Sequence, residues 1–365
     1  MPNVTQTVSN YLGGVSKQPD TKKIPGQLVD CINAYPDPTF GLTKRPGFKF
    51  LKGLGNENTL TNAKWFYIHR DNAEKYIGNI KGTDIKIWNV TTGVEATVTY
   101  TANANTSYLT GTTANDYDIL TVQDTTIVTN KTKTVTTQAN PSFTANKVGT
   151  VRLRAVTPNT TYSVTVNGST VTNTTGDSAS ADAILTSLKN SINGLSISGM
   201  TVTQLDSSLE LSCSSAFTLT GKGGADNERL DTYQNQVANV TALPDRSLHH
   251  RVVKVLNTSS DNDTYYSRFI ADNGTSGAGY WEEYIAPDAS PGLTATTMPH
   301  ELVNTGTNAF TFRAITWTAR LTGDDTTNSH PSFVGKKIQQ AFFHSSRLGF
   351  LVDDNVSMSQ ANEFF

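Results

Sequence analysis

Short alternations of apolar and polar residues, separated by turn-forming residues, recur along most of the chain. Residues 64–69 and 75–80 predict two strands around the polar turn 70–74. Further alternations follow at spacings near ten residues, at 84–90, 96–101, 119–122 and 126–129. Short strands at such spacings are typical of an antiparallel sheet, a sandwich or a propeller blade.

A different pattern begins near residue 145. Residues 162–166 and 169–172 alternate on either side of Asn167-Gly168, and an Asn-Gly pair between alternating strands strongly indicates a hairpin with a type I′ turn. Residues 200–214 predict a second hairpin around a polar turn at 206–208.

A single helix is predicted between these hairpins. The apolar residues of 181–192 recur on one helical face, Ser180 precedes them as an N-cap, and Asn193-Gly194 ends them. One helix beside a small sheet makes an inserted α+β module, for which we expect the bounds 145–242.

Strand patterns resume after Pro244, at 251–256, 265–270, 280–285, 309–321 and 342–351. The last two residues are Phe364 and Phe365, although termini usually taper into polar residues. We therefore expect propeller-like or sheet strands over 55–144 and 243–365, the second set truncated.

The first 54 residues show no such alternation. Glycine and proline interrupt them repeatedly, as at Gly13-Gly14, Pro25-Gly26 and Pro46-Gly47. A segment of this kind rarely has its own core. We expect 1–54 to be an irregular arm that serves as an interface region.

Composition strengthens the mainly β prediction. Threonine accounts for 56 of the 365 residues, and only 16% of residues are charged. Threonine is β-branched and suits a half-exposed pleated surface, whereas so few charges argue against coiled coils, helical bundles and charged disorder.

The net charge of −2 is distributed unevenly. Residues 1–54 carry seven basic and three acidic side chains, and residues 125–176 carry five basic and no acidic ones. Basic segments of this kind can lie beside a polyanion. The alternative is that these are simply solvated faces of the protein.

Neither a membrane segment nor a metal pattern is predicted. No apolar run approaches the roughly 20 residues that span a bilayer, and the N-terminus lacks the features of a secretory signal. Cys31 and Cys213 lie far apart without metal-like spacing. We expect two free, buried thiols, in a protein assembled in a reducing cytoplasm.

One stretch resembles a catalytic pair. Trp281-Glu282-Glu283 places an aromatic residue beside two carboxylates, and paired carboxylates are what a glycosidase requires. However, adjacent residues of a strand point to opposite faces of its sheet. Both carboxylates therefore cannot face one substrate, and we predict no catalytic residues.

Other polar clusters also favour ordinary structural roles. Asp261-Asn262-Asp263 lacks the glycine and later glutamate of a calcium loop, and His249-His250 should face opposite ways without further zinc ligands. Gly221-Lys-Gly-Gly224 lacks the frame of a phosphate-binding loop. We predict neither a metal site nor a cofactor.

Several short motifs, in order along nearly the whole chain, together indicate a family. They are Gly13-Gly-Val-Ser-Lys-Gln-Pro19, Gly41-Leu-Thr-Lys-Arg-Pro-Gly47, Trp281-Glu-Glu283, Arg320-Leu-Thr-Gly-Asp324, Pro331-Ser-Phe333, Arg347-Leu-Gly-Phe-Leu351 and Ser357-Met-Ser359. Their order and spacing resemble the tail tubular protein B, or nozzle protein, family of short-tailed phages of the podovirus type.

The resemblance implies a structural virion protein of the phage tail, assembled in the host cytoplasm, without enzymatic activity. It implies a hexameric ring that contacts the tail tubular protein A adaptor ring and the tail fibres and conducts double-stranded DNA during ejection. It also implies an incomplete or interrupted β-propeller with inserted domains. Family members are longer, so the chain resembles their N-terminal part.

The motif residues are interpreted as determinants of fold and interface. They are Gly13, Gly14, Val15, Gln18, Pro19, Arg45, Pro46, Gly47, Trp281, Glu283, Arg320, Gly323, Asp324, Pro331, Phe333, Arg347, Leu348, Gly349 and Ser359. The glycines Gly13, Gly14, Gly47 and Gly349 should supply backbone shapes that a Cβ would obstruct. The three arginines should each satisfy several acceptors with one planar fork.

Five basic residues are candidates for the DNA-facing lumen, namely Lys131, Lys133, Lys147, Arg152 and Arg154. The competing hypothesis is a carbohydrate-binding or depolymerising phage tail protein, based on the Thr- and Asn-rich β surface and on Trp281-Glu282-Glu283.

Overall fold

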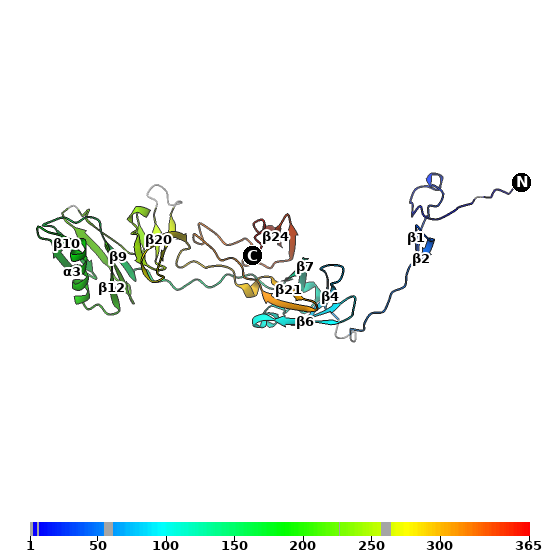
Figure 1. Ribbon diagram of the computed structural model, residues 1–365, viewed down its shortest axis with the longest axis horizontal. Coiled ribbons are helices and arrows are strands. Elements are labelled where there is room, and N and C mark those ends of the chain that lie inside the picture. The colour runs from blue at the N-terminus through cyan, green and yellow to red at the C-terminus, as the bar shows by residue number, and fades with distance from the viewer. Residues whose placement is uncertain (1–2, 6, 55–60, 226, 257–263) are drawn as a thin grey trace. The chain divides into compact units, whose positions relative to one another are not determined.

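The computed structural model describes residues 3–5, 7–54, 61–225, 227–256 and 264–365 (Figure 1). The chain forms two compact units, the first comprising Met1–Asn56 with Thr91–Gly93 and the second Glu57–Val90 with Val94–Phe365. Strands dominate, so the mainly β prediction is confirmed. Asp261-Asn262-Asp263 lies outside the described residues.

The first unit has little regular structure. It contains one short 3-10 helix, η1 (Asp20–Lys22), and one hairpin, β1 (Ala34–Asp37) with β2 (Gly41–Lys44). Among its described residues up to 54, only Gly26 is buried. This segment therefore has no apolar core of its own.

The largest sheet of the second unit has eight strands in the order β3-β4-β5-β6-β22-β21-β8-β7. Its strands are β3 (Lys64–His69), β4 (Lys75–Lys81), β5 (Asp84–Asn89), β6 (Glu95–Tyr100), β7 (Tyr117–Val122), β8 (Thr125–Asn130), β21 (His300–Gly306) and β22 (Ala309–Ala314). Only the β6–β22 pairing is parallel. The outermost strands β3 and β7 lie close to each other, so the sheet is nearly closed like a barrel.

Aromatic side chains fill this sheet. Tyr76 packs edge-on against Phe310 at 5.1 Å between ring centroids, and both are fully buried. Tyr108 ends the short helix α2 (Ala104–Tyr108) and stacks on His300 at 4.0 Å. Burial lowers the pKa of His300 to about 4, so its imidazole is neutral at physiological pH.

The eight-stranded sheet is discontinuous in sequence. Strands β21 and β22 insert between β6 and β8, although residues 131–299 separate them from β8 along the chain. Short helices η2 (Thr101–Asn103) and η3 (Ala114–Asp116) connect β6 to β7, on either side of α2.

The segment 131–299, between β8 and β21, contains the α+β module. Its helix α3 (Ala181–Gly194) packs on two sheets, ordered β11-β10-β14 and β12-β13-β9-β15. The strands are β9 (Val148–Leu153), β10 (Thr161–Val166), β11 (Ser169–Thr174), β12 (Met200–Leu205), β13 (Ser208–Cys213), β14 (Leu219–Gly223) and β15 (Leu230–Tyr233).

Local signals correctly located the elements of this module. Asn167 and Gly168 both have positive φ between β10 and β11, as a type I′ turn requires. The Ser180 side chain accepts a hydrogen bond from the Ala183 amide at 3.2 Å, and the helix ends at Gly194. Both cysteines are free, and Cys213 is buried here as expected. The expectation of burial was wrong for Cys31, which is only partly covered because it lies in the arm.

A five-stranded sheet follows, ordered β16-β18-β19-β20-β17. Its strands are β16 (Gln236–Val237), β17 (Arg246–Leu248), β18 (Val252–Val255), β19 (Tyr265–Ala271) and β20 (Ser276–Tyr284). The 3-10 helix η4 (Val240–Ala242) lies between β16 and β17, and η6 (Ala295–Thr297) lies between β20 and β21 of the eight-stranded sheet.

The last sheet has three strands, β23 (Gln340–His344), β24 (Arg347–Val352) and β25 (Asn355–Met358). The prediction of one strand over 342–351 was wrong, because Ser345 and Ser346 adopt positive φ and turn the chain back. The strand predicted over 309–321 also ends earlier, at Ala314.

Candidate functional site

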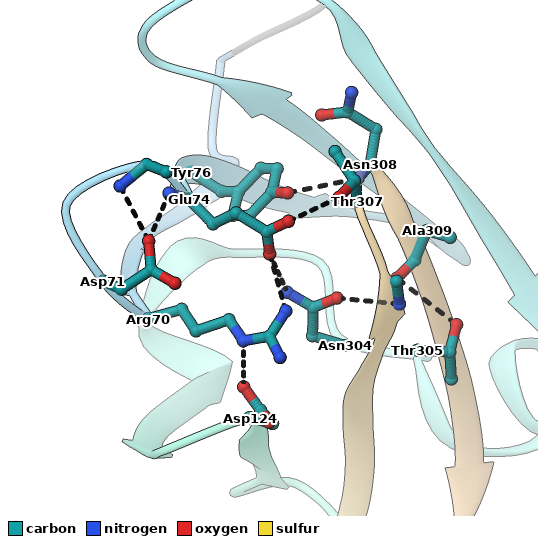
Figure 2. A network of polar contacts seen from close by, with 12 residues as sticks. Arg70, Asp71, Glu74, Tyr76, Asp124, Asn304, Thr305, Thr307, Asn308 and Ala309 are labelled. Carbon is teal, nitrogen blue, oxygen red and sulfur yellow. Dashed lines mark hydrogen bonds and ion pairs between the residues drawn. The ribbon is translucent and has the colours of Figure 1, made fainter.

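Three hairpin turns of the eight-stranded sheet meet in one polar network, which we call the turn clasp: Arg70, Glu74, Asp124, Asn304 and Thr307 (Figure 2). Arg70 contacts Glu74 and Asp124, each at 2.8 Å. Glu74 also accepts hydrogen bonds from Thr307 at 2.6 Å and from Asn304 at 3.3 Å. The clasp therefore ties the returning β21–β22 hairpin to the two hairpins made before residue 131.

Replacing Glu74 by Gln should destabilise the second unit by about 1 kcal/mol, because the Glu74 carboxylate is 13% exposed but its partner Arg70 is 37% exposed, so solvent screens the pair. Hydrogen bonds from Thr307 and Arg70 hold the pKa of Glu74 below its usual range. The contribution of these hydrogen bonds to the free energy of unfolding is therefore complete at pH values above the pKa of Glu74 in the unfolded chain. It is lost as pH falls through the pKa of Glu74 in the folded chain.

Urea unfolding at pH 7 and in acid measures this effect. Glu95→Gln is the matched control, because Glu95 is half exposed and its contact with Lys86 is 4.0 Å long. The role of the carboxylate would be contradicted if Glu74→Gln lost no more stability than Glu95→Gln. It would also be contradicted if the loss of stability in Glu74→Gln were the same in acid as at pH 7.

The first family motif forms a crossing of two extended segments in the arm. Gly13 donates its amide to the Gly26 carbonyl at 3.0 Å, and Val15 forms a parallel bridge with Leu28. A Cβ on Gly13 would lie 2.8 Å from the Gln27 side chain, and Gly14 has φ +73°. Gly13 is thus favoured by close approach of the neighbouring segment, and Gly14 by its left-handed backbone.

The end of this motif starts a 3-10 turn. The Gln18 amide contacts the Ser16 hydroxyl at 3.3 Å, and the Pro19 carbonyl accepts from the Lys22 amide at 2.8 Å. Pro19 precedes η1 as its N-cap.

The second arm motif behaves differently. The Arg45 amide donates to the Asn33 carbonyl at 2.8 Å, while its guanidinium lies over the Phe48 ring at 5.5 Å. Pro46 is exposed beside it. The expectation for Gly47 was wrong, because its φ is not positive and a Cβ would meet no described atom within 4 Å.

Exposed apolar side chains are the main feature of the arm. Fourteen large ones lie in its described residues, namely Val4, Val8, Tyr11, Leu12, Val15, Ile24, Val29, Ile32, Tyr35, Phe40, Leu42, Phe48, Phe50 and Leu51. Phe48 is 97% exposed. Exposing this many large apolar side chains to water is unfavourable, and none of them is covered within the described part of the arm.

The C-terminal motifs converge on one cluster around β24. Arg347 donates to the Ser359 carbonyl at 3.0 Å, and the Leu348 amide donates to the Ser359 hydroxyl at 3.1 Å. A Cβ on Gly349 would lie 2.2 Å from the Phe342 ring, so a larger residue there would displace this ring. These residues align β24 with the segment that follows β25.

The same cluster has an apolar side. Phe333 and Leu348 belong to one buried core, and Phe333 packs edge-on against Phe350 at 5.8 Å. The Pro331 carbonyl accepts from the Val334 amide at 3.0 Å, closing the turn that presents Phe333. The Pro331 motif and the Arg347 motif are therefore spatial neighbours.

The Arg320 motif lies in a long connection between β22 and β23. The Arg320 side chain is only 5% exposed and pairs with Asp325 at 2.7 Å. Gly323 has φ +80° and bridges Ile285. Asp324 accepts from the Thr327 and Thr326 amides, and these bonds hold its pKa below the usual range. This motif thus stabilises a turn.

Trp281 and its neighbouring carboxylates also have structural contacts. The Trp281 indole donates to the Pro244 carbonyl at 2.6 Å and packs on Phe269. Glu282 pairs with Arg268 across the sheet at 2.5 Å. Glu283, the next residue of β20, is exposed beside Thr322 and Gly323. The two carboxylates therefore do not form a joint acid–base pair.

The five basic candidates do not share one element. Lys131 and Lys133 follow β8, while Lys147 precedes β9. Arg152 and Arg154 lie on and just after β9, where Arg152 donates to the Thr241 carbonyl at 2.9 Å and Arg154 lies 3.4 Å from Asp231. The guanidinium groups are thus already engaged within the chain.

A buried charge cluster was not predicted. Arg251 and Glu210 form an ion pair with side chains 4% and 0% exposed. Hydroxyls of Thr150 and Ser247 contact Glu210 at 3.0 and 3.1 Å. Burial raises the pKa of Glu210, while Arg251 opposes this effect. The cluster joins strand β13 of the module to β17 of the next sheet. In the sequence, the only indication of this cluster was Glu210, a single charged residue within the otherwise uncharged strand segment 209–213.

The histidine prediction was partly wrong. The rings of His249 and His250 lie side by side, 3.7 Å apart, because His250 has φ +63° and does not continue a strand. Among the described residues no group of three acidic, histidine or cysteine side chains could hold a metal ion. The described part of the chain contains no helix long and apolar enough to cross a membrane.

These observations indicate the class of protein to which the chain belongs. Strands dominate, the motif residues stabilise turns and packing, and the arm exposes large apolar side chains, as in a structural component of a larger assembly. The sequence pattern of the bacteriophage nozzle protein family matches residues 1–365, so the chain belongs to that family of phage tail proteins. It is 27% identical to "Tail tubular protein gp12" of Escherichia phage T7, over all of this chain and 47% of that protein. The chain thus spans about half the length of this relative.

Proposed function

We propose that the chain is a subunit of the tail nozzle, a ring that conducts double-stranded DNA out of the virion. The observation that carries the proposal is the arm, whose fourteen exposed apolar side chains have no core within the subunit. A neighbouring copy in a closed ring supplies the missing cover, because every subunit then presents the same arm to the same surface.

We further propose a hexamer, with the tail tubular protein A adaptor ring and the tail fibres as partners. Assembly takes place in the host cytoplasm, and the product is part of the virion tail. These proposals rest on family membership and on the resemblance of the motifs.

A DNA duct has to position the duplex without holding it, since many phosphate contacts would create deep electrostatic traps. A subunit of net charge −2 suits this requirement. We propose that some of the five basic candidates approach the lumen. Lys131, Lys133 and Lys147 are favoured, because Arg152 and Arg154 contact Thr241 and Asp231.

We also propose the domain division 1–54, 55–144, 145–242 and 243–365, with the outer strand regions contributing to an interrupted propeller. The family-motif residues act as fold and interface determinants in this scheme. The three-stranded sheet β23-β24-β25 suits one incomplete blade.

Electron microscopy of the assembled protein tests the nozzle. Six-fold rings with an open centre are expected, whereas compact monomers with hydrolase activity would overturn the proposal.

The competing carbohydrate depolymerase is tested by a glycan-degradation assay that compares the unmodified chain with Glu283→Gln. We expect no activity in either, because Glu282 is paired with Arg268 and Glu283 lies on the opposite face of the strand. Activity that disappears in the variant would establish the enzyme.

A further inference from the structure

An apolar pocket opens beside strand β25, at one edge of the three-stranded sheet. Its volume is about 310 Å³, and its lining includes the large apolar side chains of Leu293, Trp317, Phe333, Phe350, Met358 and Phe365. Among its described lining residues only Glu363 is charged. A pocket with this lining favours apolar groups, because their burial removes them from water.

Strand β25 has one unpaired edge. It pairs with β24 alone, and just beyond its end the Ser359 amide donates to the Leu348 carbonyl at 2.8 Å. Because hydrogen-bonded pairs alternate along antiparallel strands, this bond directs the amides of Val356 and Met358 away from β24. Neither amide has a hydrogen-bond partner in the described part of the chain. The outer edge of β25 can therefore pair with another strand.

Small residues at this edge leave space on the core side of the sheet. Ser357 lies opposite Phe350, which belongs to the buried core, and directly opposite side chains share one face. Ser357 and Ser359, two positions apart, both line the pocket. A strand added along β25 places every second side chain on this face, beside the two serines. The site therefore suits two large apolar side chains that are separated by one residue.

The arm carries such a pair of side chains. Phe48 and Phe50 are 97% and 82% exposed, and residues 45–54 form neither helix nor strand. Within the residues that the structure describes, the backbone of 47–51 has no hydrogen-bond partner. In a strand, side chains two positions apart lie on the same face. This segment can thus pair through its backbone while both rings point to one side.

The charges of the two surfaces are also complementary. Residues 44–52 carry four basic side chains and no acidic one. Glu363 is exposed at the pocket and forms no ion pair with the described residues. Opposite charges at the rim of an apolar contact favour association and fix its register.

We propose that Phe48 and Phe50 from the arm of a neighbouring copy fill this pocket, while residues 47–51 pair as a strand with the outer edge of β25. In strand addition the backbone bonds give affinity and the side-chain pockets give specificity. The proposal rests on the proposed ring, since the arm of one copy contacts the second unit of the next. Such a head-to-tail contact is the kind that closes into a ring.

A fluorescein-labelled peptide of residues 44–52 tests the pocket independently of assembly. Fluorescence anisotropy follows its titration with the full chain carrying Phe48→Ser and Phe50→Ser, whose own arm cannot compete for the pocket. We expect binding in the micromolar to millimolar range. A peptide with both phenylalanines replaced by serine should bind at least about tenfold more weakly, because two apolar side chains are lost. Equal binding of both peptides, or of neither, would overturn the proposal.

A second pair of variants tests the strand pairing. Val356→Pro, added to the same chain, removes an outward amide, and Val356→Thr is the matched control because it keeps this amide. The proline variant should bind the peptide about fivefold more weakly, since one backbone hydrogen bond is lost. The threonine variant should bind it like the parent chain. Equal losses in two variants that circular dichroism shows to be folded would contradict strand pairing.

Photocross-linking in the assembled chain identifies the copy that supplies the arm. The photoreactive amino acid p-benzoylphenylalanine replaces Phe48, and isotopically labelled and unlabelled chains are mixed before assembly. Mass spectrometry should find position 48 joined to Met358 or another pocket residue, in pairs of one labelled and one unlabelled peptide. The same group at Phe40, next to β2, is the control and should not join to the pocket. Cross-links within one copy only, or to other surfaces, would overturn the proposal.

These experiments separate the failure of this contact from the failure of the proposed nozzle. Six-fold rings without peptide binding or pocket cross-links would support the ring and overturn the contact. Peptide binding that requires both phenylalanines, in a chain that forms no rings, would support the contact and overturn the ring.

Discussion

Replacing Arg251 by Ala is expected to reduce the free energy of unfolding by about 3–5 kcal/mol, because the change leaves a buried carboxylate without its charge partner. Glu210 is 0% exposed, and two hydroxyls cannot replace the guanidinium. Arg251 also lies 4.9 Å from the Tyr233 ring and donates to the Gln234 carbonyl. Denaturant unfolding followed by tryptophan fluorescence measures the loss.

Two comparisons isolate the role of burial. Arg268→Ala removes the same residue type from a partly exposed pair with Glu282, and should cost about 0–1 kcal/mol. The double variant Glu210→Leu with Arg251→Met removes both charges and should recover much of the stability. If Arg251→Ala costs no more than Arg268→Ala, the cluster does not hold the module to the neighbouring sheet.

Replacing Ile32, Phe40 and Phe48 by Ser in the full chain should abolish assembly into rings. These side chains are 78%, 78% and 97% exposed in the single chain. Burying each in an interface contributes about 1.5–3 kcal/mol, so losing all three weakens each contact more than a thousandfold. Analytical ultracentrifugation should show monomers.

The same triple variant should unfold like the unmodified chain, because its changed residues bury nothing within one subunit. A control replaces Val240, Leu321 and Val356, which are exposed in the second unit, by Ser. It should still assemble. Rings formed by the arm variant, or monomers formed by both variants, would contradict the role assigned to the arm.

Local sequence signals were sufficient for the α+β module. The turn at Asn167-Gly168, the cap at Ser180 and the stop at Gly194 each act within a few residues of the chain. Such signals depend on backbone conformation and not on distant partners. The composition and the missing apolar periodicity of 1–54 likewise indicated an arm.

Long-range pairing could not be derived in this way. The parallel contact of β6 with β22 joins residues near 98 and 310, and no local pattern specifies it. The Ser345-Ser346 turn was missed because serine rarely adopts positive φ, and here the flanking strand pairing imposes that conformation. Packing outweighed local preference.

The candidate site was foreseen in part. Gly13, Gly14 and Gly349 have the expected backbone or packing constraints, but Gly47 has neither. The ion pair of Glu210 with Arg251 and the turn clasp both join residues far apart in sequence. A single sequence cannot reveal such partners, although an isolated charge in an apolar strand indicates that one is needed.

The late return of β21 and β22 determines the order of events during synthesis. At about 5–20 residues per second, the ribosome needs roughly 10–30 s to extend the nascent chain from residue 130 to residue 300. Strands β6 and β8 keep unpaired edges throughout that interval, because β21 and β22 are their partners. The module, whose contacts are local, can complete its fold meanwhile. The half-made sheet is thus the stage at which nascent chains are most exposed to aggregation and chaperone capture.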